Sequence, residues 1–267
     1  MKNPNLIDLS IIILTWNTKK YIYSFLKSIE KFKNDLVYEI IVIDNGSTDK
    51  TIEDLSVDYP EIVCVRNDTN KGTSQRNKGL QISHGKYVAF VDSDIELLEN
   101  HTFDMLVEFL KKNKDVGLVA PQLVLDNGEI QLSCKNFLSF YTPIMRRFDF
   151  LPFIKKTRLY RDQLLADWDH RETRYVDYTV SAFWVFRKEI YNNIGGLDEK
   201  IFYAPEDVDY CLRIRKSGYK VAYFPSVKVK HHYQRITRKI FSKITYEHIK
   251  GLLYYFKKHK YLLKPKI

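Results

Sequence analysis

The run Val88-Ala89-Phe90-Val91-Asp92-Ser93-Asp94-Ile95 constrains the fold more than any other stretch of the chain. Its apolar start indicates a buried strand, and its abrupt end places two carboxylates at the carboxyl end of that strand. Open α/β sheets bind ligands at this edge. An Asp-x-Asp pair there can bind a divalent cation through oxygen atoms, and the cation can bind a diphosphate. Taken alone, so short a pattern favours an acidic turn after a strand, and other parts of the chain must decide.

The first 120 residues alternate between two kinds of pattern. Short β-prone runs are separated by stretches whose apolar residues recur every three or four positions, as on one face of a helix. This alternation predicts a mostly parallel sheet with connecting helices. The predicted strands are 9–14, 39–43, 62–65, 88–91 and 116–120, and the predicted helices are 22–32, one after residue 49 that Ser47 or Thr48 caps, one carrying Arg76 and Asn77, and 103–110.

The second half of the chain breaks this alternation. A hairpin is predicted around Asp126-Asn127-Gly128, and residues 136–172 show no clear period. A β run follows at 178–186, and Pro205 opens a helix. Two strands and a terminal helix are predicted at 220–224, 227–231 and about 237–261. We therefore predict one compact α/β domain with a C-terminal helical extension.

Composition limits the class of protein and its partners. The chain has 267 residues, 45% of them hydrophobic, which is enough for a full core, and a net charge of +10. The positive excess suggests a polyanionic partner: nucleic acid, an anionic membrane or a phosphorylated substrate. No apolar run approaches the ~20 residues that span a bilayer, and no signal peptide opens the chain. Three scattered cysteines fit a reducing compartment, so we expect a cytoplasmic protein.

Polar residues follow three of the predicted strands, namely Thr15-Trp16-Asn17, Asp44-Asn45-Gly46-Ser47 and Asp92-Ser93-Asp94. Each group alone is explained by turn and cap chemistry. In a parallel sheet, however, the three strand ends share one edge, so a ligand site is the better explanation of all three together. Asp44 can accept a hydrogen bond from a nucleobase N–H. Lys71-Gly72 and Arg76 can face phosphates.

These motifs, in this order, resemble those of the family 2 inverting glycosyltransferases with the GT-A fold. That fold is an α/β, Rossmann-like architecture with a mostly parallel central sheet and helices on both faces. The segments that carry the resemblance are Ile11–Asn17, Val42–Asp49, Asn70–Gly72, Arg76–Gly79, Val91–Asp94, Gly195–Glu199, Glu206–Arg213 and His231-His232.

The Glu206-Asp207-Val208-Asp209 helix with a downstream histidine looks most like the rhamnosyltransferase-like branch. That branch implies dTDP-rhamnose as donor, with a UDP-sugar as the alternative, and a glycan or lipid-linked acceptor in cell-surface polysaccharide synthesis. One departure is Ser181-Ala182-Phe183-Trp184, where such enzymes usually have Gly-Ala followed by smaller residues. The resemblance divides the chain into a GT-A domain, 1–235, and a basic amphipathic helix, 236–267. Within the domain, 1–120 would bind the nucleotide-sugar and 121–235 the acceptor.

The resemblance also implies roles for particular residues. Asp207 would be the catalytic base, Glu206 and Asp209 would orient it or bind the acceptor, and Trp184 would contact the acceptor. Acidic residues in the first turn of a helix also complement its dipole, by ~0.3–1 kcal/mol each, which explains one or two of them but not the whole set. The residues assigned to the nucleotide are Thr15, Trp16, Asn17, Asp44, Lys71, Gly72, Arg76, Asp92 and Ser93.

A metal site is part of the same expectation. Asp94 would bind Mg²⁺ or Mn²⁺, with Asp92 near the ribose or at the metal through water. His231 would be a third contact to the metal or diphosphate. His232 is the alternative, since a slip of one residue along a strand turns the other side chain inward.

The terminal segment carries its own pattern. Lys239, Lys243, Lys250 and Lys257 fall on one narrow stripe of a helical wheel, opposite apolar residues. Such faces suit an anionic membrane surface, which would place the protein peripherally at the inner face of the membrane. A helix packed on the domain with a solvated lysine face explains the pattern equally well, and a homodimer contact is a further alternative. The apolar residues are Phe241, Ile244, Ile249, Leu252, Leu253 and Phe256.

Two other classes of protein compete with this interpretation. A sugar-phosphate nucleotidyltransferase also uses acidic metal ligands on an α/β sheet, but Thr15-Trp16-Asn17-Thr18 lacks the glycine-rich phosphate loop of that class. A nucleic-acid-binding protein would explain the charge. Acids clustered at strand ends would repel its phosphates, and no familiar nucleic-acid motif appears, so we expect no nucleic-acid partner.

Overall fold

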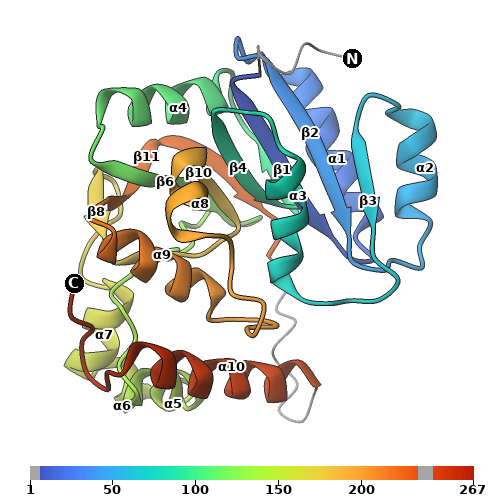
Figure 1. The fold of residues 1–267 in the computed structure, drawn as a ribbon. Coiled ribbons are helices and arrows are strands. Elements are labelled where there is room, and N and C mark those ends of the chain that lie inside the picture. The colour runs from blue at the N-terminus through green and yellow to red at the C-terminus, as the bar shows by residue number, and fades with distance from the viewer. Residues whose placement is uncertain (1–6, 234–242) are drawn as a thin grey trace.

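A nine-stranded sheet runs through the computed structural model, which describes residues 7–233 and 243–267 (Figure 1). Its strands follow the order β3-β2-β1-β4-β10-β6-β11-β5, and β8 pairs with β11 beside this path. A separate two-stranded sheet joins β7 to β9. The strands are β1 (Leu9–Thr15), β2 (Tyr38–Asp44), β3 (Val63–Arg66), β4 (Tyr87–Asp92), β5 (Ile95–Leu97), β6 (Val116–Val124), β7 (Cys134–Lys135), β8 (Arg174–Val176), β9 (Tyr178–Thr179), β10 (Phe183–Arg187) and β11 (Lys220–His231).

The sheet is mostly parallel, as the alternation predicts. Strands β2, β1 and β4 are parallel neighbours, and β3 extends them on the outer side. Strand β10 lies antiparallel between β4 and β6, and β11 then runs parallel to β6. Because β1, β2 and β4 point the same way, their carboxyl ends meet at one edge of the sheet.

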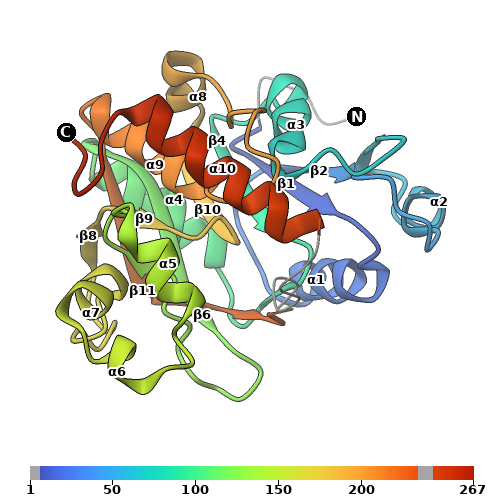
Figure 2. The ribbon, with the colours of Figure 1, turned by 90° about the horizontal axis from the view of Figure 1, so that it is seen from below.

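Helices cover both faces of the sheet and enclose two hydrophobic cores (Figures 1 and 2). On one face, α1 and α4 contribute Phe25 and Phe103. On the other face, α3, α9 and α10 contribute Leu80, Leu212 and Phe256. The helices are α1 (Lys19–Lys31), α2 (Thr51–Asp58), α3 (Arg76–Ile82), α4 (Thr102–Lys112), α5 (Tyr141–Arg147), α6 (Pro152–Lys155), α7 (Arg158–Leu164), α8 (Lys188–Ile194), α9 (Glu206–Lys216) and α10 (Lys243–His259), and a 3₁₀ turn spans Thr73–Gln75.

Three local predictions are wrong. The run 178–186 forms two strands, β9 and β10, because the chain turns between them. The two strands predicted at 220–231 are one strand, β11, whose register to β6 shifts between Phe224 and Lys228. The irregularity accommodates Pro225, which has no N–H to donate. Neither Ser47 nor Thr48 caps α2, whose N-cap residue is Lys50.

Helix α10 packs on α9 through a buried charge cluster. Asp209 has no exposed surface and accepts hydrogen bonds from Arg213 (2.9 Å), Lys258 (2.6 Å) and His259 (2.8 Å). Burial alone would raise the pKa of Asp209, but the His259 hydrogen bond and the charges of Arg213 and Lys258 lower it to about 2. Lys258 also binds Asp198 at 2.7 Å. The packed alternative for the terminal helix is therefore observed.

The faces of α10 differ in part from the helical wheel. Leu252 and Phe256 pack on the core together with Tyr255, whereas Ile249 and Leu253 are more than half exposed. The side chains of Lys239, Phe241 and Lys243 lie outside the described residues. Within the described parts of the chain, no helix combines the length and apolar character needed to cross a bilayer.

Candidate active site

The three predicted strand ends do meet at one edge of the sheet. Thr15, the last residue of β1, is paired with Asp44, the last residue of β2, and Leu14 is paired with Asp92 of β4. The backbone N–H of Asn45 donates to the Thr15 carbonyl at 2.8 Å, which ties the first two ends together. The Thr18 hydroxyl lies 2.8 Å from that of Thr15 and 2.7 Å from that of Ser93, so it links β1 to β4.

Hydrogen bonds shape the loops after β1 and β2. Both oxygens of the buried Asp44 side chain accept from Ser47, whose hydroxyl also accepts from the backbone N–H of Asn17 at 2.9 Å. The backbone of Asn17 adopts φ +52°, and its side-chain oxygen accepts a hydrogen bond from the N–H of Thr48 at 2.8 Å. Asp44 and Asn17 thus fix the loop. Trp16 is 43% exposed, so its ring is open to a ligand at this edge.

Gly72 and Arg76 connect this edge to the second half of the chain. Gly72 adopts φ +87°, and an added Cβ would collide with the backbone of Phe202. This close approach brings the segment before α9 to the sheet edge. Arg76 is buried and ion-paired with Asp92 instead of facing a phosphate as predicted. It also donates to the Ser181 hydroxyl at 3.4 Å.

Asp92, Asp94 and His231 bring one ligand atom each within 4.8 Å of one another. Nε2 of His231 lies 3.4 Å from Asp94, and its other ring nitrogen lies 2.7 Å from the Gln131 side-chain oxygen. Burial alone would lower the pKa of His231, but the hydrogen bond and charge of Asp94 raise it above the ordinary value. Two carboxylates and an imidazole whose orientation a second hydrogen bond fixes are a donor set that suits a divalent cation.

His231, and not its neighbour, faces the two carboxylates. His232 turns the other way, with its ring nitrogens 3.2 Å from Glu96 and 2.6 Å from Asp126. His231 is the last residue of β11, and the alternation of successive side chains in an extended chain accounts for the opposite direction of the residue that follows it. The predicted metal residues are thus brought together.

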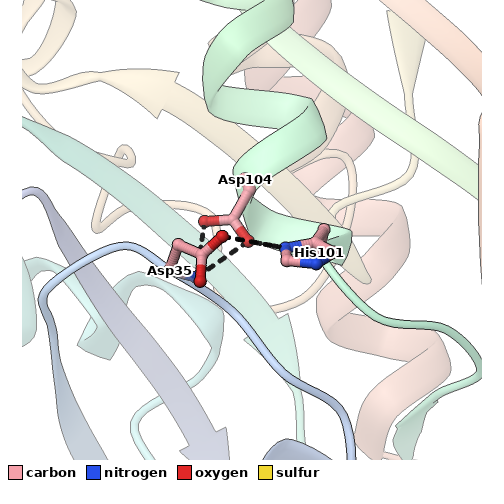
Figure 3. A group of neighbouring side chains, drawn as sticks. All are labelled: Asp35, His101 and Asp104. Carbon is pink, nitrogen blue, oxygen red and sulfur yellow. Dashed lines mark hydrogen bonds and ion pairs between the residues drawn. The ribbon is translucent and has the colours of Figure 1, made fainter.

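A second group of side chains also brings one possible ligand atom each within 4.8 Å of one another, but its contacts have a structural role (Figure 3). Asp35, His101 and Asp104 lie where the loop before β2 meets the start of α4. Asp104 accepts hydrogen bonds from the backbone N–H groups of Asp35 and Leu36, each at 3.0 Å, and His101 lies 2.9 Å from it. These contacts hold the loop on α4, at the amino end of β2 and away from the converged strand ends.

Glu206 is joined to the metal residues by a chain of polar contacts. The Ser181 hydroxyl, which accepts from Arg76, donates to Oε1 of Glu206 at 3.1 Å. The chain therefore runs from Asp92 through Arg76 and Ser181 to Glu206. The other Glu206 oxygen is buried and has no hydrogen-bond partner among the described residues. Burial and the charge of Asp207 raise the pKa of Glu206 to about 7.

Asp207, the predicted base, is half-buried beside Glu206 at the start of α9. Burial raises the pKa of Asp207, and the positive charges of Lys135 and Arg146 oppose that rise. A carboxylate with a raised pKa is the better proton acceptor near neutral pH.

Two predicted acceptor residues are placed elsewhere. Asp209 is fully buried in the contact between α9 and α10, with its oxygens already bound. Trp184 is also fully buried, stacked on Phe90 and Tyr210, with its ring N–H donated to Thr179 at 2.7 Å. Neither side chain reaches the surface of the site. The patterns misled because an acid in a helix and an aromatic residue in a strand look alike whether they face a substrate or the core.

Sequence reasoning missed four residues at the site. Gln131 orients His231, and Ser181 links Arg76 to Glu206. The charge of Lys135 opposes the raised pKa of Asp207. Burial and the charge of Glu206 raise the pKa of Tyr203. Only Ser181 carried a signal in the sequence, as a departure from the family pattern.

The buried Glu206 carboxyl makes stability depend on pH. It is neutral in the folded protein below about pH 7, whereas in the unfolded chain it ionises above its ordinary pKa of 4.5. Wild type should therefore lose stability relative to Glu206→Gln as the pH rises from 4.5 to 7, by at most about 3 kcal/mol. Urea unfolding in EDTA at several pH values measures this difference. The exposed Glu129→Gln should show no such trend, and a flat profile for Glu206→Gln would contradict the assignment.

Comparison with known proteins agrees with this geometry. Residues 10–195 match the model of Glycosyl transferase family 2. The chain is 23% identical over 261 residues to rhamnosyltransferase WbbL of Escherichia coli K12, covering 94% of each chain. It is also 23% identical to the N-acetylglucosaminyl-diphospho-decaprenol L-rhamnosyltransferase of Mycobacterium tuberculosis H37Rv, covering 84% of this chain and 76% of that protein.

Solved structures show the same fold. The crystal structure of GalNAc-T7 with UDP, GalNAc and Mn²⁺ superposes with a TM-score of 0.68 at 16% identity, covering 96% of this chain and 48% of that one. The TarS 1–349 structure from S. aureus in complex with UDP gives 0.60 at 18%, covering 85% and 61%. The fold is thus the GT-A fold, and the protein is a glycosyltransferase. It belongs to glycosyltransferase family 2 and is similar to the rhamnosyltransferases of that family.

Proposed function

We propose that this protein is an inverting, metal-dependent glycosyltransferase that moves rhamnose from dTDP-rhamnose to a lipid-linked or glycan acceptor in cell-surface polysaccharide synthesis. The observation that carries the proposal is the pairing of two groups. Asp92, Asp94 and His231 lie within 4.8 Å of one another, and the Arg76–Ser181 relay joins them to Glu206, next to Asp207. One group suits a leaving diphosphate, and the other suits an attacking hydroxyl.

The chemistry divides between these groups. Asp207 accepts the proton of the acceptor hydroxyl as that oxygen attacks the sugar carbon of the donor. Asp92, Asp94 and His231 would hold Mg²⁺ or Mn²⁺, which when bound offsets the negative charge of the leaving diphosphate. Arg76 and Ser181 position Asp92 and Glu206. Trp16, exposed at the end of β1, is available to stack on the base, and Lys71 to contact phosphate.

The relatives support the proposed donor and acceptor. Rhamnose is supported by the two rhamnosyltransferases, which resemble the chain over most of its length. A UDP-sugar is the second candidate. A stretch of 89 residues, 32% of this chain, is 39% identical to an E. coli UDP-Glc:alpha-D-GlcNAc-diphosphoundecaprenol beta-1,3-glucosyltransferase. That relative and the mycobacterial enzyme both act on a sugar joined to a polyprenol through a diphosphate, which supports the same class of acceptor here.

Thermal shift with a nucleotide panel tests the proposal. We expect Mn²⁺-dependent stabilisation by dTDP or UDP, because a ligand that binds only the folded state raises the melting temperature. Stabilisation by a nucleoside triphosphate but not by a diphosphate would indicate a nucleotidyltransferase instead. Stabilisation by an oligonucleotide alone would contradict both enzyme assignments.

An exposed face of α5, α6 and α10 supports attachment to an anionic membrane. More than half of the large exposed apolar side chains of the described residues lie within 140–159 and 246–267. The two segments are in contact, since the rings of Phe140 and Phe256 lie 5.6 Å apart, and the helices share one side of the molecule (Figure 2). Exposed basic residues accompany them: Arg146, Arg147, Lys155, Lys156, Arg158, Lys250 and Lys257.

Co-sedimentation with anionic liposomes tests this attachment. Lys250→Glu/Lys257→Glu should weaken binding in a salt-sensitive way, because each surface lysine near anionic lipid contributes on the order of 1 kcal/mol. Phe150→Ser/Phe153→Ser should weaken the binding that survives salt. Lys111→Glu/Lys112→Glu on α4, at the opposite side of the molecule (Figure 1), is the matched control. Equal binding of all four proteins, or of none, would leave this face as a packing or dimer surface.

A further inference from the structure

Lys135 is a buried lysine, and burial together with the charge of Arg146 lowers its pKa to about 7, against the opposing charge of Asp207. It is 8% exposed, and its ammonium makes no hydrogen bond or ion pair with the described residues. Its ammonium lies 5.9 Å from the centre of the Tyr178 ring, which gives only a weak cation–π contact. Burying an ammonium that no carboxylate contacts is costly, and the charge of Asp207, which makes no ion pair with it, offsets only part of that cost. A bound anion would account for the position of Lys135.

Arg146 adds a second positive charge at the same place. It lies on α5, is exposed, and likewise has no hydrogen-bond or ion-pair partner among the described residues. Its positive charge shifts the pKa of Lys135, Asp207, Tyr178 and His248, and so adds to the positive potential around the Lys135 ammonium. His248 of α10 adds no charge near neutral pH, because burial and the charges of Arg146 and Arg147 lower its pKa to about 4.

The two cations act on the predicted base and not on the metal residues. Asp207 experiences the charges of Lys135 and Arg146. The charges that act on Asp92 are those of Arg76, Asp94 and His231. The cations therefore lie on the acceptor side of the site, separate from the residues that suit the donor diphosphate. A group bound by them would sit beside the hydroxyl that Asp207 deprotonates.

We propose that Lys135 and Arg146 form an anion site that binds the phosphate or diphosphate of the acceptor. The proposal rests on the proposed function, and it explains how one acceptor molecule is held at both ends. Its sugar hydroxyl lies at Asp207, and its phosphate lies at the two cations. The exposed apolar face of α5 and α10 adjoins this site, since Arg146 belongs to α5 and His248 to α10. A lipid that carries the diphosphate would leave the site along that face.

Steady-state kinetics with two acceptors tests the site. The probes are N-acetylglucosaminyl diphosphate on a short alkyl chain and the neutral octyl glycoside of the same sugar. Lys135→Met and Arg146→Gln should each raise KM for the diphosphate acceptor about 10- to 100-fold, the usual effect of losing a hydrogen bond between charged groups. KM for the neutral acceptor and for the donor should stay unchanged. Arg147→Gln, which removes a neighbouring charge on α5 that is not among the causes of the lowered pKa of Lys135, is the matched control.

Three outcomes would overturn the proposal. Wild type could fail to prefer the diphosphate acceptor, or both variants could retain that preference, or the variants could raise KM for the donor instead, which would place the cations on the donor diphosphate. Failure of the proposed function is distinguishable, because no donor would then be turned over with either acceptor. In that case inorganic pyrophosphate binding in EDTA decides the anion site by itself. Affinity that depends on Lys135 supports the site, and affinity that does not, or no binding, excludes it.

Discussion

Asp207→Asn is expected to abolish most of the transfer activity while leaving nucleotide binding intact. The amide is nearly isosteric but cannot accept the proton of the acceptor hydroxyl, so kcat should fall about 10²- to 10⁴-fold, the usual contribution of a general base. KM for the donor should change little, because Asp207 belongs to the acceptor side of the site. Nucleotide thermal shift on the same preparation controls for folding.

Near-normal turnover by Asp207→Asn would reassign the base. Glu206 would then be the candidate, since it is adjacent and has a buried oxygen with no partner among the described residues. Asp209 is a poor alternative because its oxygens are bound by Arg213, Lys258 and His259. Glu206→Gln would separate these cases, because only loss of the true base removes the proton acceptor.

Asp94→Ala is expected to remove metal-dependent nucleotide binding together with transfer. Asp94 lies in the group whose ligand atoms are within 4.8 Å, and its loss leaves only Asp92, already paired with Arg76, and His231. Charge stabilisation by a bound cation is worth several kcal/mol, so kcat/KM should fall on the order of 10³-fold or more. Titrating Mn²⁺ against dTDP or UDP binding measures the effect.

The second acidic cluster provides the control for this variant. Asp35→Ala makes the same substitution in the Asp35–His101–Asp104 group, where the backbone contacts of Asp104 hold a loop (Figure 3). Asp35 is largely exposed, so the variant should fold and keep wild-type metal dependence. If Asp94→Ala retained unchanged Mn²⁺ dependence, or if Asp35→Ala lost it, the metal site would be misplaced.

The parts of the site that follow strand ends could be predicted from the sequence. Apolar runs that stop at Thr15, Asp44 and Asp92 reveal both the strands and their shared edge, since parallel strands end on the same side. The third metal ligand could be predicted only as one of two neighbours, His231 or His232. The structure distinguishes them, because their side chains point to opposite sides at the end of β11. Such features depend on local periodicity, which a sequence displays directly.

Features that depend on tertiary contacts could not be predicted. Three features join segments far apart in the chain or elements with weak patterns: the pairing of Arg76 with Asp92, the burial of Asp209 under α10, and the effect of the Lys135 charge on Asp207. Lys135 lies in a strand of two residues, which is too short to show any period. A buried cation at such a position is visible only after its neighbours are placed.

Release of nucleoside diphosphate from a panel of nucleotide-sugars tests the central claim most directly. With Mn²⁺ and the N-acetylglucosaminyl diphosphate acceptor, wild type should release dTDP from dTDP-rhamnose, or UDP from a UDP-sugar, at a rate that the acceptor increases. Asp94→Ala and Asp207→Asn should both lose that acceptor-dependent rate, whereas Asp35→Ala should keep it. No release from any donor, or equal release by wild type and Asp94→Ala, would contradict the account.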